Sequence, residues 1–144
     1  MVKYIESFCK SLGNYACYFF SLIDIAEKVT GKSFDVISAI SDAIQERYID
    51  FNYKNYDDSD NCYVNNPCGV LYMLTGRSWT VKKVAAPYTP VEGDYIIEAW
   101  HKDGNNNKDG SPILHFKRPE YNSLQHSVSV EQGKIVSYRV FRMV

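Results

Sequence analysis

The segment GNYACYFFSLIDIAEKVTG, residues 13–31, places a cysteine between a glycine-containing loop and an apolar helical repeat. The sequence therefore predicts Cys17 at the first turn of a helix. A thiol attacks carbonyl carbon as its thiolate, and both a helix N-terminus and a nearby imidazolium lower the pKa of a thiol. Cys17 is thus a candidate nucleophile if the fold brings a histidine to it, and otherwise a small buried residue that helps a helix to pack.

All three histidines lie in the second half of the chain. His101 follows the strand-like run IIEAW and borders a loop rich in glycine and asparagine, so we expect a solvated strand end. His115 lies within the strand-like segment PILHFKR, and His126 begins HSVSVE, whose alternation predicts a half-buried strand. From these patterns either His115 or His126 could approach Cys17 across a cleft between helices and sheet.

The other cysteines are Cys9, Cys62 and Cys68. Cys68 follows a proline and is also predicted at a helix start, so position alone does not distinguish it from Cys17. We expect structural roles for these three, because Cys17 alone has both the glycine loop before it and the longer apolar helix after it. The cysteine spacings do not match zinc sites, and the acidic residues 52–61 lack the full spacing of a calcium loop. We expect no metal and no cofactor.

Three helical segments are expected in the first half of the chain, from apolar residues at helical spacing. They cover residues 18–29, 33–50 and 66–76. We expect Gly31 to end the first helix, and Ser33 and Asn66 to cap the second and third. Ile37 belongs to the apolar stripe of the second helix.

The period changes to two after the third helix, where β-branched and aromatic residues dominate. Strands are expected at 78–85, 94–102, 112–118, 126–131 and 134–143, with EQGK as a tight turn between the last two. Helices come first and strands afterwards, which favours an α+β fold with N-terminal helices packed on a C-terminal antiparallel sheet. The length of 144 residues indicates one domain, residues 1–144.

The composition limits the classes of partner. With 16 basic and 17 acidic residues, the net charge of −1 gives no electrostatic reason to expect nucleic acid or an anionic membrane. No stretch reaches the roughly 18 apolar residues of a membrane span, and no cleaved signal is recognisable, so we expect a cytoplasmic protein with reduced cysteines. The 12 tyrosines are many for this length. Those in the segments 52–66 and 87–90 could line a groove for a peptide or small ligand, or simply cover the core.

The order of the parts resembles the papain-like cysteine peptidase superfamily, especially compact bacterial members such as the bacteriocin-processing peptidases. The matching pieces are GNYACYFFSLIDIAE for the helix with the nucleophile and ILHFKR for the strand with the histidine. The segment NCYVNNPCGVL and the tail SVSVEQGKIVSYRVF also resemble a papain-like family from spirochaetes and phages. The resemblance implies a single papain-like domain with a cysteine nucleophile, a histidine base and a third residue that orients the imidazole.

Carried onto this chain, the resemblance makes Cys17 the nucleophile and His115, in its HF pair, the base. His126 is the alternative base, because HSVSV also resembles the histidine strand of the superfamily. For His126 the matching place on the next strand is near 138–139, which offers neither an acid nor an amide. For His115, the following segment offers Asn122 or Glu120 as the orienting residue, and we prefer His115 for this reason.

Two features of the chain depart from the superfamily. The glutamine that usually precedes the cysteine as an oxyanion donor is missing, and losing one such donor typically costs about a hundred- to a thousandfold in rate. Ser11, Asn14 or the backbone N–H of Cys17 could substitute. No Asp-Pro pair follows the histidine strand, where the chain reads KRPEYNSLQ.

These observations leave three functions open. The first is a thiol hydrolase or peptidase that attacks an amide of a peptide or protein. The alternative is a catalytically inactive binding module of the same fold, from a phage or another mobile element, that grips a host protein or small ligand in the former active-site cleft. A structural part of a larger assembly is a third possibility.

Overall fold

The computed structural model describes residues 16–51, 62–123 and 127–144. Within these ranges the chain forms four helices, a four-stranded antiparallel sheet and a two-stranded ribbon, which confirms the predicted α+β class. In chain order the elements are α2 (Cys17–Thr30), α3 (Val36–Gln45), β1 (Ile49–Phe51), β2 (Cys62–Val64), α4 (Pro67–Thr75), β3 (Trp79–Ala85), β4 (Tyr95–His101), β5 (His115–Lys117), α5 (Val128–Gln132) and β6 (Lys134–Met143).

The ends of α2 and α4 follow the predicted signals. Gly31 ends α2 in the left-handed conformation, at φ 70°, and its N–H donates to the carbonyl of Glu27. Asn66 caps α4, since its side-chain oxygen accepts from the N–H of Gly69 at 2.9 Å, and Pro67 occupies the first turn.

The start of α3 differs from the prediction. Asp35, not Ser33, is its N-cap, because the Asp35 carboxylate accepts from the N–H of Ile37 at 3.1 Å. Ile37 is 56% exposed, so its predicted place on the buried stripe was wrong. The buried residues of α3 are Ala39, Ile40 and Ala43.

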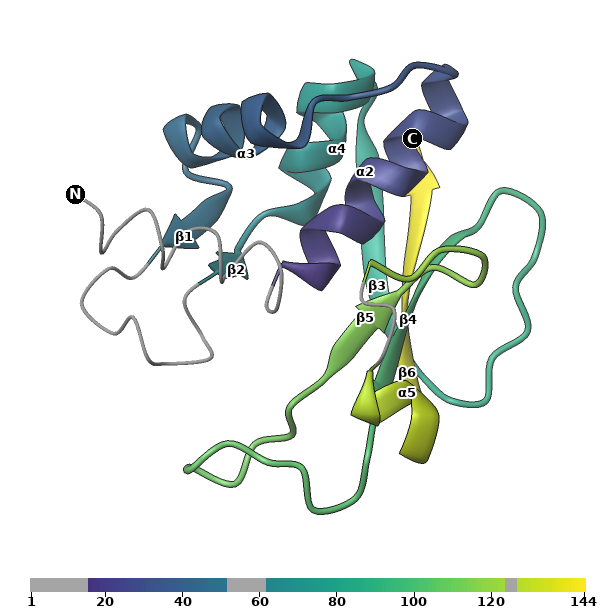
Figure 1. Ribbon diagram of the computed structural model, residues 1–144. Helices are drawn as coiled ribbons and strands as arrows, with labels where there is room; N and C mark the ends of the chain where they lie inside the picture. The colour runs from purple at the N-terminus through teal and green to yellow at the C-terminus, as the bar shows by residue number, and fades with distance from the viewer. Residues whose placement is uncertain (1–15, 52–61, 124–126) are drawn as a thin grey trace.

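The main sheet has the strand order β3-β6-β4-β5 with every neighbouring pair antiparallel. The last long strand, β6, therefore lies inside the sheet, and β5 is a short strand at its edge (Figure 1). Figure 1 shows α2, α3 and α4 gathered toward one end of the molecule, with α2 beside β5 and α4 beside β3. The prediction that helices precede the sheet in the chain is thus confirmed for α2, α3 and α4 and the four strands of the main sheet.

Two segments were predicted incorrectly. Residues 128–132 form the helix α5 rather than a strand, so EQGK connects a helix, not a strand, to β6. At its end a Cβ on Gly133 would meet the carbonyl oxygens of Ser129 at 2.2 Å and of His101 at 2.3 Å, which explains the glycine. Residues 49–50, predicted as the end of a helix, instead belong to β1 (Ile49–Phe51), which pairs with 62–64 as the ribbon β1-β2.

The core lies between α2, α4 and the inner face of the sheet. Phe19, Leu22 and Ile25 of α2 are fully buried, together with Ile97 of β4 and Phe141 of β6. Because α2 is buried along most of its length, packing fixes its axis and therefore the position of its first residue. An apolar core of this kind places the N-terminus of α2 against the edge strand β5.

Candidate functional site

Cys17 is the first residue of α2, as predicted, and it lies against the strand that carries His115. Its Sγ accepts a hydrogen bond from the backbone N–H of Phe116 at 3.4 Å. The side chain is 8% exposed. The thiol therefore sits where the end of a buried helix meets the edge of the sheet.

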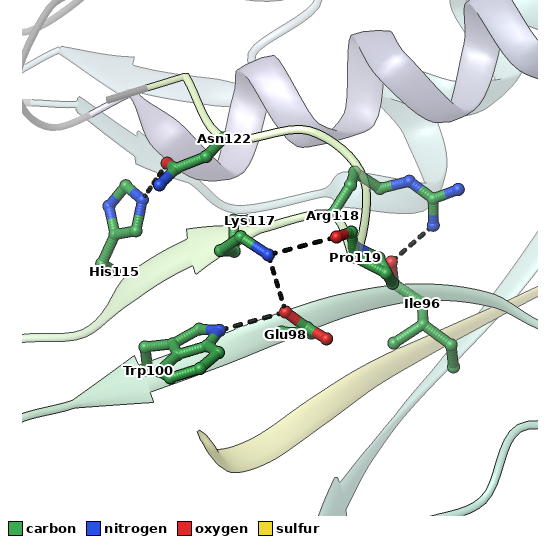
Figure 2. Close-up of polar contacts among 8 residues, drawn as sticks. All are labelled: Ile96, Glu98, Trp100, His115, Lys117, Arg118, Pro119 and Asn122. Atoms are coloured by element: carbon green, nitrogen blue, oxygen red, sulfur yellow. Dashed lines mark hydrogen bonds and ion pairs between the residues drawn. The ribbon is translucent and has the colours of Figure 1, made fainter. Parts of the chain in front are cut away.

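His115 is the first residue of β5 and is 6% exposed. Its Nε2 lies 2.6 Å from the side-chain oxygen of Asn122 (Figure 2). An amide oxygen only accepts hydrogen bonds, so Nε2 carries the hydrogen and donates it. In the neutral ring the lone pair is then on Nδ1, the nitrogen that can take a proton. Of the two orienting residues considered from the sequence, Asn122 contacts the ring, whereas Glu120 is exposed.

Cys17 and His115 line the same cavity, which has a volume of about 720 Å³. Tyr18, Tyr63 and Arg139 also line it. A volume of this order suits a side chain or a short peptide segment rather than a single water. The structure thus gives the thiol and the imidazole access to a common space.

Burial controls the ionisation of both groups. It raises the pKa of the Cys17 thiol, and this effect outweighs the backbone N–H groups of Phe116, Tyr18 and Cys17 itself, which lower that pKa. Burial also lowers the pKa of His115, against the hydrogen bond to Asn122, while the charge of Lys117 lowers it further. At neutral pH Cys17 is therefore a thiol and His115 a neutral imidazole.

Among the described residues, no side chain caps the N-terminus of α2. Its N-cap residue is Ala16, which makes no side-chain hydrogen bond to the helix. The first N–H groups of a helix have no partner within the helix and carry partial positive charge. An anion formed at Cys17 can therefore accept hydrogen bonds from these N–H groups.

Polar contacts hold β5 to its neighbours around the histidine. Figure 2 shows Lys117 Nζ and Trp100 Nε1 both directed at one carboxylate oxygen of Glu98, each at 3.1 Å. Arg118, the residue after β5, pairs with Asp24 of α2 at 3.1 Å. These contacts fix the strand of His115 to β4 on one side and to the helix of Cys17 on the other.

The remaining predicted residues do not join this cluster or lie outside the description. His101 Nε2 lies 3.1 Å from the carbonyl oxygen of Asn105, so this histidine interacts with its own loop. Cys68 is half-buried in α4, and burial raises the pKa of its thiol. Cys9, Ser11, Asn14 and His126 lie outside the described residues. The side chain of Cys62 also lies outside the description.

Sequence reasoning missed Tyr18 and Arg139 as parts of the site. The ring of Phe116 packs edge-on against Tyr18, with centroids 4.7 Å apart, and the Arg139 guanidinium lies 5.2 Å from the centre of the same ring. A signal for Arg139 existed, because alternation puts it on the same face of β6 as Phe141, which is buried. A charged residue at an inward position of a strand is a candidate for a site.

Within residues 16–51, 62–123 and 127–144, no group of three histidine, cysteine or acidic side chains is placed to hold a metal ion. Within the same ranges, none of the helices has the length and apolar character needed to cross a membrane.

The fold and the site define an α+β protein with a buried thiol, a buried imidazole and a half-buried amide where a helix N-terminus meets a sheet edge. Comparison with family models matches residues 3–143 to the family described as "Protein of unknown function, DUF261". The match spans nearly the whole chain, so the protein belongs to this family. No curated protein and no solved structure matches it.

Proposed function

We propose that this protein is a papain-like thiol hydrolase that cleaves an amide bond of a peptide or protein. The observation that carries the proposal is the 2.6 Å hydrogen bond between His115 and Asn122, on a strand whose next residue donates to the Cys17 thiol. A nucleophile, a base and a group that orients the base are the three parts that acyl transfer by a thiol requires.

In the proposed reaction, Sγ of Cys17 forms a bond to the carbonyl carbon of the substrate while its proton passes to Nδ1 of His115. The π electrons of the carbonyl move to its oxygen, which becomes an oxyanion. When the carbonyl re-forms, the C–N bond breaks and the leaving nitrogen takes the proton from His115. Water then attacks the thioester carbonyl carbon and gives a proton to His115. The C–S bond breaks to release the carboxylic acid, and the sulfur takes that proton back from His115.

The direction of the pKa shifts selects between two ways of starting this reaction. A preformed thiolate–imidazolium pair needs a low thiol pKa, but burial raises the pKa of Cys17 and lowers that of His115. The proposal is therefore general-base catalysis, in which the proton leaves the thiol as the sulfur attacks. Asn122 contributes by holding the proton of the ring on Nε2.

The oxyanion needs donors that do not depend on the missing glutamine. The uncapped N–H groups at the start of α2 fit this role, because Ala16 provides no competing acceptor. Ser11 and Asn14, the other substitutes considered from the sequence, lie outside the described residues.

Labelling with a peptidyl vinyl sulfone, followed by intact-mass and peptide-mapping mass spectrometry, tests the proposal. We expect one adduct per chain, located on Cys17, absent in Cys17→Ala and strongly reduced in His115→Ala. The matched controls Cys68→Ala and His101→Ala should label as the wild type does. Equal labelling of the cysteines, or labelling of Cys17 that does not depend on His115, would contradict the proposal.

A catalytically inactive binding module is the second candidate, and one observation favours it. The Cys17 thiol is buried, accepts a backbone N–H and has a raised pKa, as expected of an inert structural cysteine. This candidate predicts that Cys17→Ala keeps the biological activity in full, with no adduct formed on the wild type. Loss of activity in a folded Cys17→Ala variant would exclude it.

A further inference from the structure

Among the described residues that line the cavity, the charged side chains are all basic. They are Lys82, Lys83 and Arg139, and none of the described lining residues is an aspartate or glutamate. The chain as a whole is nearly neutral, with 16 basic and 17 acidic residues. The excess of cations is therefore local to the cavity and does not reflect the composition of the chain.

The position of Arg139 within the sheet strengthens this observation. Arg139 of β6 lies directly opposite Lys83 of β3 in the antiparallel register. Directly opposed residues of an antiparallel pair project from the same face, and like charges placed this way destabilise the sheet. An anion bound between the two side chains would remove this repulsion.

The partners of Arg139 differ from those of two neighbouring arginines. Arg118 pairs with Asp24, and Arg142 pairs with Asp94 at 2.6 Å. Arg139 instead donates to the hydroxyl of Ser137 at 2.9 Å and stacks over Phe116, and within the described ranges no carboxylate pairs with it. A half-buried guanidinium that is oriented but not neutralised is suited to receive a carboxylate from a ligand.

The same contacts place this cation beside the thiol. Phe116 packs against Arg139 through its ring and donates its backbone N–H to Sγ of Cys17. Phe116 therefore contacts both the cationic group of Arg139 and the thiol of Cys17, the candidate nucleophile. A peptide that fills the cavity can reach both at once.

We propose that the cavity selects peptides with an acidic side chain, whose carboxylate is bound by Arg139 and Lys83 next to the bond presented to Cys17. The inference names the substrate class of the proposed hydrolase, and as far as cleavage is concerned it rests on that function. The binding itself requires only the two cations and the cavity.

Isothermal titration calorimetry on the Cys17→Ala protein tests the binding without any chemistry. The probes are alanine pentapeptides with blocked ends and a central glutamate, glutamine or phosphoserine. We expect the glutamate peptide to bind about tenfold more tightly than the glutamine peptide, as a charge-assisted contact allows. The preference should disappear in Arg139→Met and fall in Lys83→Met. It should persist in Lys134→Met, which removes an exposed charge at the start of the same strand.

Several outcomes overturn the inference: no measurable binding, equal binding of the glutamate and glutamine peptides, or a glutamate preference that survives both Arg139→Met and Lys83→Met. Binding of the phosphoserine peptide without binding of the glutamate peptide would show that the cavity recognises a phosphate and not a carboxylate. This result would overturn the assignment to acidic side chains. If Arg139→Met does not fold, as judged by circular dichroism, the glutamate preference of Lys83→Met tests the inference instead, because Lys83 is exposed.

Cleavage of the same peptides by the wild type separates the two proposals. Glutamate-selective binding without cleavage supports the inference and counts against the hydrolase. Cleavage of both peptides at equal rates supports the hydrolase and overturns the inference.

Discussion

Two helices of this protein have a cysteine in the first turn, and the two cysteines differ in what lies next to them. α2 begins at Cys17, and α4 has Cys68 directly after Pro67. At α4, Asn66 caps the helix by accepting from Gly69. At α2, Ala16 leaves the helix uncapped, and β5 instead brings the N–H of Phe116 and the ring of His115 to the same region.

The comparison shows that a cysteine at a helix N-terminus is not sufficient for a thiol site. Burial raises the pKa of both thiols, so neither helix end by itself produces a thiolate. What distinguishes Cys17 is the sheet edge, which carries His115, hydrogen-bonded to Asn122 and in our proposal the base. The predictions below test this difference between Cys17 and Cys68.

Removing the base should have the largest effect. His115→Ala should lower the rate of acylation at Cys17 by about a thousandfold, because a positioned general base contributes about 10²–10⁴-fold. The rate at Cys68 should not change. The rates are measured by peptide mapping after timed reaction with a peptidyl electrophile, and His101→Ala serves as the control. A Cys17 rate that stays within twofold of the wild type would show that the imidazole has no part in the difference.

Removing the orienting amide should have a smaller effect. Asn122→Ala should lower the Cys17 rate by about a hundredfold, as misplacement of a reacting group does. Asn122→Asp should restore much of it, because a carboxylate also accepts from Nε2–H. The pH at which His115 titrates should also rise in Asn122→Asp, which ¹H–¹⁵N spectra of the imidazole can follow. Equal rates of acylation at Cys17 in Asn122→Ala and Asn122→Asp would show that this position does not orient the base.

The acid side of the pH profile should show a smaller effect. Burial lowers the pKa of His115 from its usual 6.5 in the folded protein. Above pH 6.5 the ring is neutral in both the folded and unfolded states; as the pH falls below 6.5 the unfolded state takes up the proton first. The free energy of unfolding should therefore decrease as the pH falls from 6.5 to the lower folded-state pKa.

Urea denaturation at a series of pH values measures this effect. His115→Gln should show a weaker decrease in the free energy of unfolding over the same range. An identical pH dependence in both proteins would mean that His115 is not held neutral by burial.

The capping residue of α4 should have the smallest effect, and only on stability. Asn66→Ala should lower the free energy of unfolding by about 1 kcal/mol, because the N–H of Gly69 loses its acceptor. The rate of acylation at Cys17 should remain that of the wild type. Thermal denaturation measures the stability, and peptide mapping measures the rate of acylation. A lower rate of acylation at Cys17 in this variant would show that the two helix ends are coupled.

Local signals predicted much of the fold. Gly31, Asn66 and Pro67 act at their helix ends through contacts within a few residues, so a sequence pattern suffices. The segment of α5 was misread because Val128 and Val130 alternate with serines as in a strand. The ribbon β1-β2 was missed because each of its strands has only three residues, too few to show an alternating pattern.

The candidate site was predictable only in part, for a similar reason. Asn122 follows His115 by seven residues, so a short connection brings the two together. Arg139 enters the site through the register of β6 with β3 and through the ring of Phe116, and neither contact is encoded in local spacing. The sequence alone also could not show that Cys17 would be buried against β5.

The most direct test of a base-assisted Cys17 thiol is the pre-steady-state reaction with p-nitrophenyl acetate. Acylation of the thiol releases p-nitrophenolate, and transfer to a single nucleophile releases one equivalent per chain in a burst. We expect this burst in the wild type and in Cys68→Ala, and none in Cys17→Ala or His115→Ala. A burst that survives in Cys17→Ala, or one that His115→Ala does not change, would contradict the account.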